Sequence, residues 1–417
     1  MSKFVVKGGK RLKGEIKVNG SKNAALPIMC ASLLTKEKTT LLNVPDIADI
    51  RSMMKILEGL GAKMKFGKNT LEIDPKNLKF SKPQNDLVCK MRASILLLGP
   101  LLANFGKVKM AFPGGCVLGK RSVHSHTSAL KNLGCKILDE TNELSLEAKN
   151  LKGCKIIMSE LSVTATENVI MAAVKAEGKT EIKLAAAEPH VQDLCKFLNK
   201  MGAKIEGIGT NTLKIEGVKN LHGTTYEITG DYLEAGTFAI AAAATNGDVV
   251  IKGIDTNQLD SLWQKFAEVG VEFTLKENEV HVKGYKNLKA VEVLRTAVFP
   301  SFPTDLQAPF AVLLTQAKGE SKIFETLFEG RLNYITELER MDAKVQLLNP
   351  HQALIKGPCT LKGIPIASYD IRAGAAMVIA ALIATGETEI SNINYLDRGY
   401  ENFDGRLRSL GADIRRV

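Results

Sequence analysis

Six segments of the chain are apolar on every side and indicate buried helices. Each is rich in alanine, leucine and methionine and lacks the polar face that a surface helix carries. They span residues 24–34, 93–103, 166–176, 234–244, 306–315 and 373–384. Short β-branched segments follow several of them, at residues 38–44, 179–184, 248–254 and 387–393. The pattern predicts helices that lie inside a layer of strands.

A second, amphipathic helix belongs to each repeat of this pattern. Its C-terminal end has the form Leu-x-x-Leu-Gly-Ala-Lys, runs into a strand and recurs about every 70 residues, a longer period than that of common solenoid repeats. The glycine position suits a helix C-cap. It falls at Gly61, Gly134, Gly202, Gly270, Asp342 and Gly411. Six copies of a strand, helix, strand, helix, strand, strand repeat, with parallel strands crossed by helices, predict an α/β fold.

The residues that lead into the six buried helices are mostly charged. They hold equivalent positions of the repeat: Lys22, Arg92, Thr164, Tyr232, Asp305 and Arg372. A helix N-terminus presents free N–H groups and a positive dipole end, which favour an anion. If the repeats face one another, the three cations converge around Asp305. Capping is an alternative for Asp305 and Ser21, but it does not explain Lys or Arg, which the dipole disfavours at this end.

A glycine-rich turn places a thiol shortly before two cations. The segment Pro113-Gly-Gly-Cys116 cannot continue a helix or a strand, so the side chain of Cys116 projects from a turn. Lys120 and Arg121 would favour the thiolate and attract an anionic ligand. The alternative is a cysteine buried in the core, where this residue type is common.

Three arginines share a further register of the repeat. Arg121 and Arg398 lie equally far before the glycine position of their repeats, and Arg331 lies close to the same register. Single arginines are usually solvated, but several at matching positions support a gathering of cations.

Composition narrows the possible functions. The 417 residues, 45% hydrophobic and 24% charged, can bury a sizeable core and suggest two or three domains. No apolar run matches a signal peptide or a membrane span, so we expect a cytoplasmic protein. Seven scattered cysteines without CxxC spacing argue against disulfides and structural zinc. The net charge of +11 suits nucleic acid or an anionic small molecule, but the chain has no long Lys/Arg run and one Trp.

Seven motifs in order along the chain carry a resemblance to a known family. They are Ser21-Lys22-Asn23-Ala-Ala-Leu-Pro, Met91-Arg92-Ala-Ser, Pro113-Gly-Gly-Cys116, Phe302-Pro-Thr-Asp305-Leu-Gln-Ala, Phe328-Glu-Gly-Arg331, Asp370-Ile-Arg372-Ala and Asp397-Arg398-Gly-Tyr. With them the chain closely resembles the UDP-N-acetylglucosamine 1-carboxyvinyltransferases, which carry out the first committed step of peptidoglycan synthesis. The resemblance spans essentially the whole length.

The resemblance implies a fold and a division into domains. The fold is two inside-out α/β barrels, each of three βαβαββ repeats, with the active site in the cleft between them. One domain would run over residues 22–230 and carry the Cys116 loop. The other would combine residues 1–21 with 231–417 and carry Asp305, Arg331, Arg372 and Arg398. The six repeats in the hydrophobic pattern agree with this fold.

The resemblance also implies a reaction. The family transfers the enolpyruvyl group of phosphoenolpyruvate to the 3′-hydroxyl of UDP-N-acetylglucosamine and releases phosphate through a tetrahedral intermediate. A positioned acid and a positioned base are needed. Cys116 resembles the acid, Asp305 the carboxylate that acts on the hydroxyl or the intermediate, and Lys22 and Arg398 complete the catalytic set. The family implies no metal, organic cofactor or protein partner, and it implies alkylation of Cys116 by fosfomycin.

Further residues match substrate contacts of the family. Lys22, Arg121 and Arg398 match the site for the phosphate of phosphoenolpyruvate. The full substrate-binding set is Lys22, Asn23, Arg92, Arg121, Ser122, Val123, His124, Ser125, His126, Ser162, Val163, Asp305, Leu327, Arg331, Asp370, Arg372 and Arg398. Four residues depart from the family pattern and bear on the nucleotide contacts: His124, Glu160, Thr164 and Tyr232.

Two alternative functions follow from the same features. The sister enzyme, which transfers enolpyruvate to shikimate 3-phosphate, shares the repeat and the cationic site but lacks the Pro-Gly-Gly-Cys loop. A basic module that binds nucleic acid or processes RNA ends is the alternative from a different class, and salt-dependent oligonucleotide binding would favour it.

Overall fold

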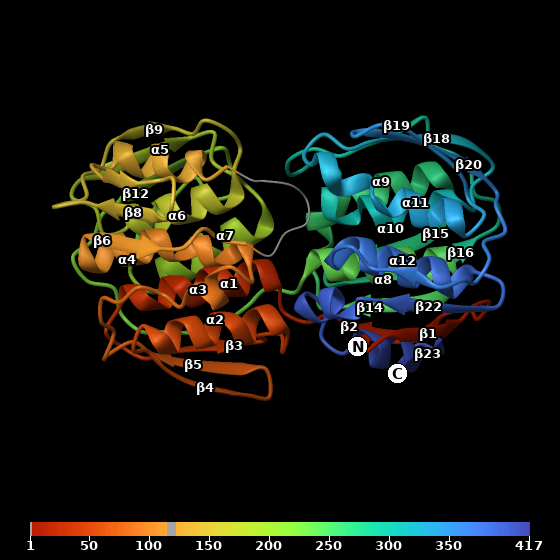
Figure 1. Ribbon diagram of the computed structural model, residues 1–417, viewed down its shortest axis with the longest axis horizontal. Coiled ribbons are helices and arrows are strands. Elements are labelled where there is room, and N and C mark those ends of the chain that lie inside the picture. Colours follow the sequence, from red (N-terminus) through yellow and green to blue (C-terminus); the bar gives the residue numbers. More distant parts are fainter. Residues whose placement is uncertain (1, 115–121) are drawn as a thin grey trace. The chain divides into compact units, whose positions relative to one another are not determined.

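The computed structural model describes residues 2–114 and 122–417, which form two compact units (Figure 1). Unit A contains residues 20–114 and 122–229, and unit B contains residues 2–19 and 230–417. Among the described residues, a glycine stands at both points where the chain passes from one unit to the other, at Gly20 and Gly230. A Cβ atom on Gly20 would lie 1.7 Å from the carbonyl oxygen of Asn43, and one on Gly230 would lie 1.9 Å from that of Gly253. No larger residue fits at either passage.

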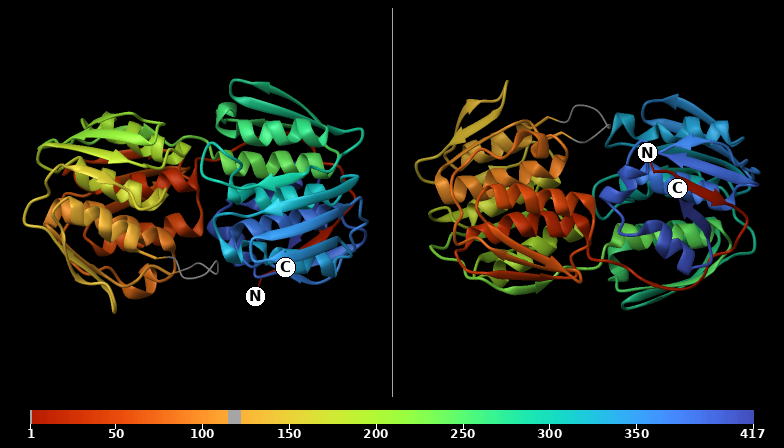
Figure 2. Two further views of the ribbon diagram at one scale, coloured as in Figure 1. Left: turned by 90° about the horizontal axis from the view of Figure 1, so that it is seen from above. Right: turned by 60° about the horizontal axis from the view of Figure 1, so that its bottom comes forward.

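Unit A encloses its apolar helices in strands, as Figures 1 and 2 show. The inner helices are α1 (Lys22–Ala31), η2 (Arg92–Leu97) continuing into α4 (Leu98–Phe105), and α6 (Val163–Ala173). The outer helices are α2 (Ala48–Gly59), α5 (His124–Asn132) and α7 (Pro189–Lys200), with short helices η1 (Ser32–Leu34) and α3 (Asn85–Val88). Residues of α1 and α6 are almost all buried, which confirms the prediction of enclosed helices.

The strands of unit A form three sheets within the described residues. One has the order β13 (Thr225–Glu227), β3 (Thr39–Leu42), β5 (Thr70–Asp74), β4 (Lys63–Gly67). The second has the order β11 (Lys204–Glu206), β12 (Thr212–Glu216), β10 (Lys179–Lys183), β9 (Lys155–Ile157). The third has the order β6 (Lys107–Met110), β8 (Leu144–Glu147), β7 (Lys136–Asp139).

Unit B has the same construction. Its inner helices, α8 (Tyr232–Ala244), α10 (Thr304–Leu314) and α12 (Ile371–Ile383), contact one another. Its outer helices are α9 (Asp260–Val269), α11 (Tyr334–Arg340) and α13 (Phe403–Ser409), with short helices η3 (Thr256–Leu259), η4 (Glu329–Leu332) and η5 (Ile393–Arg398). The core of unit B forms around the inner helices and the inward faces of the strands.

The strands of unit B also form three sheets among the described residues. The first two have the orders β15 (Val271–Lys276), β16 (Glu279–Tyr285), β14 (Asp248–Lys252), β2 (Lys13–Lys17), and β17 (Val293–Arg295), β18 (Gly319–Phe324), β20 (Gln352–Gly357), β19 (Lys344–Asn349). The third has the order β21 (Ile366–Ala367), β22 (Glu387–Ser391), β1 (Phe4–Lys7), β23 (Asp413–Arg416).

The repeat is confirmed, with differences in where some strands come from. Strands β2 and β13 pair in parallel with β14 and β3, and β1 pairs with both β22 and β23. Three sheets therefore receive a strand from a distant part of the chain. The repeat of β6 lacks a fourth strand in the described residues, because the segment before its inner helix contains Pro83 and forms α3 instead of an extended edge.

The ends of the helices follow local rules. All six glycine positions of the repeat lie in the left-handed region, from Gly61 with φ of 101° to Asp342 with φ of 69°, which confirms the predicted C-caps. The second inner helix is divided into η2 and α4. Pro100 falls in the first turn of α4, where its missing N–H leaves no intrahelical hydrogen bond unmade.

Helices of the described part of the chain are all too short or too polar to cross a membrane. The six cysteines within this part are free thiols. Its histidines, cysteines and carboxylates form no cluster of three or more that could hold a metal ion.

Candidate active site

The polar residues expected at the starts of the inner helices lie there. They occupy the first or second residue of each helix: Lys22 in α1, Arg92 in η2, Thr164 in α6, Tyr232 in α8, Asp305 in α10 and Arg372 in α12. Each inner helix begins slightly before the apolar pattern does, because its first turn carries these polar side chains rather than core residues.

Capping does not account for Asp305 or Ser21, so this alternative is wrong. Ser21 precedes α1 but makes no side-chain hydrogen bond to the helix, and its buried Oγ has no partner. Asp305 lies inside α10, whose N-cap is Pro303. The capping carboxylates are Asp231, which accepts from the N–H groups that follow it in α8, and Asp370, which does so in α12.

In unit A, a cation at the start of α1 faces a carboxylate of α2. Lys22 Nζ lies 3.6 Å from Asp49 Oδ2, and the two side chains are 12% and 8% exposed. Asn23 follows in the same helical turn and is half-buried. At such low exposure an ion pair is screened less than on the surface, which holds the ammonium at the start of the helix.

The segment before α5 contacts the start of η2. Arg92 Nη2 donates to the carbonyl oxygen of Ser122 at 2.9 Å, and the Ser125 hydroxyl donates to the carboxylate of Glu160. His124 is exposed at the first residue of α5, and Val123 before it is buried. The contact brings Arg92 next to the predicted nucleotide-binding residues 122–126.

His126 is held in one neutral form by a buried network. Asn168 Oδ1 accepts from the N–H of Gly99 at 2.8 Å, so the amide nitrogen of Asn168 donates to His126 Nδ1 at 3.0 Å. We therefore assign the proton of His126 to Nε2, which lies 3.2 Å from Thr164 Oγ1. Burial, with Arg92 nearby, lowers the pKa of His126 to about 3.

Ser162 and Val163 lie where α6 begins. Ser162 is the N-cap residue without a side-chain cap, and its carbonyl oxygen accepts from Thr166 Oγ1 at 2.8 Å. Val163 is the first residue of the helix and is half-buried. Together with Thr164 they present the first turn of an inner helix beside His126.

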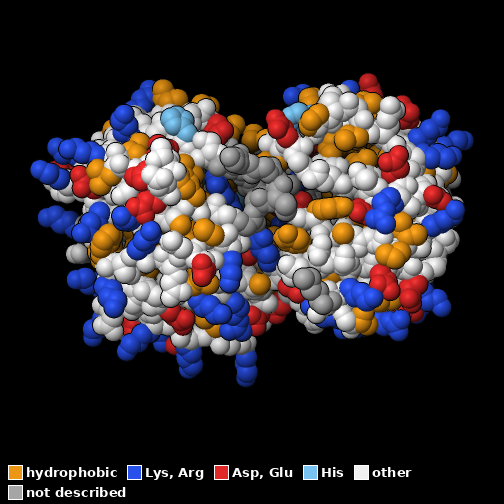
Figure 3. Space-filling model, viewed as in Figure 1, with side chains coloured by type: hydrophobic (Ala, Val, Ile, Leu, Met, Phe, Trp, Pro, Cys, Tyr) orange, Lys and Arg blue, Asp and Glu red, His pale blue; other side chains and the backbone are white. Residues whose placement is uncertain are grey.

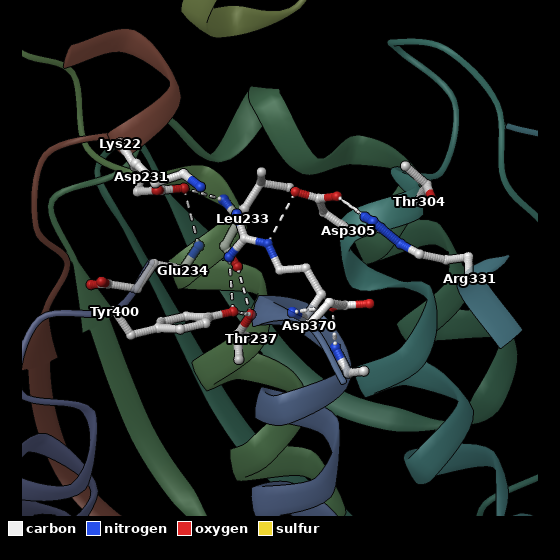
Figure 4. A network of polar contacts seen from close by, with 12 residues as sticks. Lys22, Asp231, Leu233, Glu234, Thr237, Thr304, Asp305, Arg331, Asp370 and Tyr400 are labelled. Atoms are coloured by element: carbon white, nitrogen blue, oxygen red, sulfur yellow. Dashed lines mark hydrogen bonds and ion pairs between the residues drawn. The ribbon is translucent and has the colours of Figure 1, made fainter. Parts of the chain in front are cut away.

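In unit B, one carboxylate lies between two guanidinium groups, as Figure 4 shows. Asp305 Oδ1 accepts from Arg331, and Asp305 Oδ2 accepts from Arg372 Nε at 3.0 Å. The arginine side chains are 6% and 5% exposed, whereas that of Asp305 is 24% exposed. The side chain of Asp305 is therefore partly accessible at the start of α10.

Both arginines remain charged although they are buried. Burial opposes their charge, but Asp305 and Asp370 raise the pKa of Arg331. Against the same burial, Tyr400, Asp305 and Asp231 raise the pKa of Arg372 well above its ordinary value. The cluster is therefore one of fixed charges.

Two further predicted residues of unit B are Arg398 and Leu327. Arg398 is the last residue of η5 and is half-buried. Leu327 is 38% exposed, and its N–H donates to Glu325 Oε1 at 2.9 Å. Glu325 is fully buried and also accepts from Thr304 in the first turn of α10, so the loop that carries Leu327 is tied to the helix of Asp305.

Two predicted residues, Cys116 and Arg121, lie outside the described residues. Four residues that the sequence analysis assigned to no site act on the predicted site residues. Asn168 bonds to His126, Tyr400 to Arg372 and Glu325 to Leu327, and Asp231 raises the pKa of Arg372. Asp370 and Asp231 each directly precede an inner helix, so equivalence of the repeats could have indicated Asp231. Basic side chains are spread over the surface of both units in the view of Figure 3.

Comparison with known proteins places the whole chain in one family. The model of the family described as EPSP synthase (3-phosphoshikimate 1-carboxyvinyltransferase) matches residues 6–407. The chain belongs to the EPSP synthase family. Within the family it is 44% identical to the UDP-N-acetylglucosamine 1-carboxyvinyltransferase of Halothermothrix orenii over 100% of both chains. It is 44% identical to the enzyme of that name from Trichlorobacter lovleyi, over 100% of this chain and 99% of the relative.

Solved structures of the family have the same fold. The enolpyruvyl transferase NikO from Streptomyces tendae superimposes with a TM-score of 0.90 at 24% identity, over 100% of this chain and 99% of that one. The EPSP synthase of Acinetobacter baumannii superimposes with a TM-score of 0.77 at 19% identity over 100% of both chains. The predicted α/β fold of the family is confirmed.

Proposed function

We propose that this protein transfers the enolpyruvyl group of phosphoenolpyruvate to the 3′-hydroxyl of UDP-N-acetylglucosamine and releases phosphate. The proposal rests above all on full-length 44% identity to relatives that carry the name of this transferase. The cluster of Asp305, Arg331 and Arg372 supports it, because a multiply anionic substrate pair requires fixed cations and the reaction requires a carboxylate.

In the proposed reaction the acceptor hydroxyl attacks carbon 2 of phosphoenolpyruvate while carbon 3 takes up a proton. The tetrahedral intermediate then loses a proton from carbon 3 and releases phosphate, which restores the double bond. Cys116 is the proposed proton donor to carbon 3, and Asp305 the proposed acceptor of the hydroxyl proton. Pairing with two guanidinium groups favours the ionised form of Asp305, which is the form that accepts a proton.

The arginines have a second proposed role. Guanidinium groups bind carboxylate and phosphate in the same fork geometry, so an incoming anion competes with Asp305 for Arg331 and Arg372. Lys22 and Arg398, with Arg121, are the proposed ligands of the phosphate of phosphoenolpyruvate. Transfer of guanidinium hydrogen bonds from Asp305 to substrate would make the carboxylate more basic when the reaction begins.

Unit A supplies the proposed contacts to the sugar nucleotide. Asn23, Arg92, residues 121–126, Ser162 and Val163 are the proposed contacts there, with Asp305 and Leu327 from unit B. The neutral state of His126 suits a hydrogen-bonding role better than a charge contact to diphosphate. Residues 22–230 and residues 1–21 with 231–417 are the two domains of this proposal, and its setting is peptidoglycan synthesis in the cytoplasm.

Phosphate release tests the proposal directly. The full chain is incubated with phosphoenolpyruvate and UDP-N-acetylglucosamine, with phosphoenolpyruvate and shikimate 3-phosphate, or with phosphoenolpyruvate alone. Stoichiometric phosphate and enolpyruvyl product in the first mixture only are expected. Phosphate release with shikimate 3-phosphate would instead support the sister activity, and no release in any mixture would refute enolpyruvyl transfer to either acceptor.

A further inference from the structure

Asp305 and Arg372 are connected to a chain of buried hydroxyl groups that the reaction does not itself require. The chain runs from Arg372 through Tyr400 to Thr237 and ends on the backbone of α8 (Figure 4). Thr237 is fully buried, and Tyr400 and Arg372 are 1% and 4% exposed. Three inner elements, α8, α12 and the segment after η5, therefore meet through side chains that water does not reach.

The direction of every hydrogen bond in this chain is determined. Arginine has only donors, so Arg372 Nη1 donates to the Tyr400 oxygen at 2.9 Å. Thr237 Oγ1 donates to the carbonyl oxygen of Leu233 at 2.8 Å, one helical turn earlier, which leaves Oγ1 as an acceptor. The Tyr400 hydroxyl therefore donates to Thr237 across 3.0 Å. Burial raises the pKa of Tyr400, so its hydroxyl keeps this proton at neutral pH.

The hydroxyl of Tyr400 is itself held in place. The Tyr400 ring lies 4.6 Å from that of Phe403, measured between centroids. The preceding residue is Gly399, where a Cβ atom would lie 2.5 Å from Cγ2 of Ile371 in α12. The close approach of the backbone to α12 brings the phenol oxygen within reach of Arg372. The guanidinium of Arg372 thus has a rigid acceptor on one side and Asp305 on the other.

We propose that Tyr400 is a positioning residue of the active site. Its hydroxyl holds the guanidinium of Arg372 in the rotation that directs Nε–H at Asp305 Oδ2. The planar guanidinium has fixed donor directions, so occupation of Nη1 by Tyr400 sets where Nε points. Without this acceptor, Arg372 would retain its charge but lose its orientation. The proposal rests on the proposed function only for its kinetic consequence, since the hydrogen-bond chain exists without substrate.

The variant Tyr400→Phe tests this role in the full chain by NMR. The Nε–H proton of Arg372 is the probe, because its exchange with water reports the guanidinium's rotation and its bond to Asp305. We expect exchange at least tenfold faster in Tyr400→Phe. The Nε–H of Arg406, whose Nη1 donates to Glu234, serves as internal reference and should not change. Unchanged exchange at Arg372 would overturn the proposal.

Tyr226→Phe is the control for the loss of a tyrosine hydroxyl that donates to a carboxylate. Tyr226 donates to Asp193 Oδ1 at 2.6 Å in unit A, whereas Asp305 and Arg372 belong to unit B. The variant Tyr226→Phe should lower stability without changing the exchange of the Arg372 Nε–H proton with water. A purely structural role of Tyr400 predicts that both variants affect exchange alike, in proportion to their loss of stability, and that result would also overturn the proposal.

A second pair of variants covers the case in which Tyr400→Phe does not fold. Thr237→Val removes the acceptor of the Tyr400 hydroxyl, and Thr237→Ser retains it. We expect faster Arg372 exchange in Thr237→Val and wild-type exchange in Thr237→Ser. Equal exchange in the two variants would refute the proposed chain.

Kinetics separate the failure of this inference from that of the proposed function. If the wild-type protein releases phosphate from phosphoenolpyruvate with UDP-N-acetylglucosamine, kcat/KM for phosphoenolpyruvate should fall about tenfold in Tyr400→Phe, because misorientation of a substrate-binding guanidinium costs rate. Wild-type kcat/KM in this variant would count against the inference. If the wild-type protein releases none, the proposed function fails, whereas the exchange measurements still decide on Tyr400.

Discussion

Two inner helices, α6 of unit A and α10 of unit B, are both enclosed by strands but differ in the electrostatics of their first turns. In unit A, the start of α6 is occupied by neutral groups: His126 bonds to Thr164 and Asn168, and its pKa is lowered to about 3. In unit B, the start of α10 holds Asp305 between two charged guanidinium groups. The same repeat therefore supplies neutral, buried hydrogen-bonding groups at the start of α6 and a fixed charge cluster at the start of α10.

Two carboxylates show the difference most directly. Glu167 in α6 is fully buried, and its Oε1 has no hydrogen-bond partner. Burial, together with Glu188, raises the pKa of Glu167 well above its ordinary value and so favours its protonated form. Asp305 has two guanidinium partners instead. Burial alone favours the neutral form of a carboxyl group, whereas pairing with cations favours its ionised form.

The largest effect is expected for Asp305→Asn. The change leaves Arg331 and Arg372 buried with no carboxylate between them and removes the proposed base. We expect turnover to fall by a factor of about 10²–10⁴ and the free energy of unfolding by about 3 kcal/mol. The control is Asp342→Asn, which breaks an exposed ion pair with Lys362 and should change neither quantity appreciably. Equal free energies of unfolding for the two variants would mean that Asp305 contributes no more to stability than an exposed ion pair does. That result would contradict a special charge cluster at the start of α10.

The second prediction concerns Cys116, the proposed proton donor. Cys116→Ser replaces the proposed acid with a hydroxyl that is far less acidic, so turnover should fall by a factor of about 10²–10⁴ without loss of folding. Cys89→Ser, which changes an exposed thiol outside the predicted site residues, is the control and should release phosphate at the wild-type rate. Undiminished turnover in Cys116→Ser would contradict the acid role.

The third prediction concerns the buried hydrogen bonds of His126 to Thr164 and Asn168 in unit A. The unfolded chain binds a proton at His126 below pH about 6.5, but the folded protein does so only near pH 3. His126 therefore lowers stability as pH falls through this window, by about 1.4 kcal/mol for each pH unit. His126→Gln should weaken this pH dependence, whereas His222→Gln, at an exposed position, should retain it. Denaturant unfolding between pH 4 and pH 7 measures both, and identical profiles would mean that His126 accepts a proton in the fold.

The smallest effect is expected for Glu167→Gln, with a sign opposite to that of Asp305→Asn. The raised pKa of Glu167 means that its carboxyl favours folding at low pH and that this contribution is lost as pH rises above about 4.5. The glutamine does not ionise in the unfolded chain, so we expect it to stabilise the protein at pH 7 by about 1 kcal/mol. Thermal unfolding at pH 7 and pH 4 should show a gain only at pH 7; a loss at pH 7 would indicate an ionised Glu167.

Local patterns account for the parts of the fold that were predicted correctly. All-round apolarity indicated the inner helices, and the repeated glycine position indicated the left-handed residues at 61 and 342 alike. Both depend on interactions within a few residues. The strands β2, β13 and β1 were not assigned to their sheets, because their partners lie far along the chain and any β-branched segment satisfies the same pairing rules.

The sequence by itself determined the six repeats, the helix-end positions of Lys22, Asp305 and Arg372, and the family. Only the tertiary structure decided what those side chains contact. It pairs Asp305 with Arg372 across 67 residues and Tyr400 with Thr237 across 163, and it makes Asp231 and Asp370 the caps. The physical reason is that periodicity reports which face of a segment is buried, whereas the partner of a buried polar group depends on distant segments that packing brings within 3 Å or so.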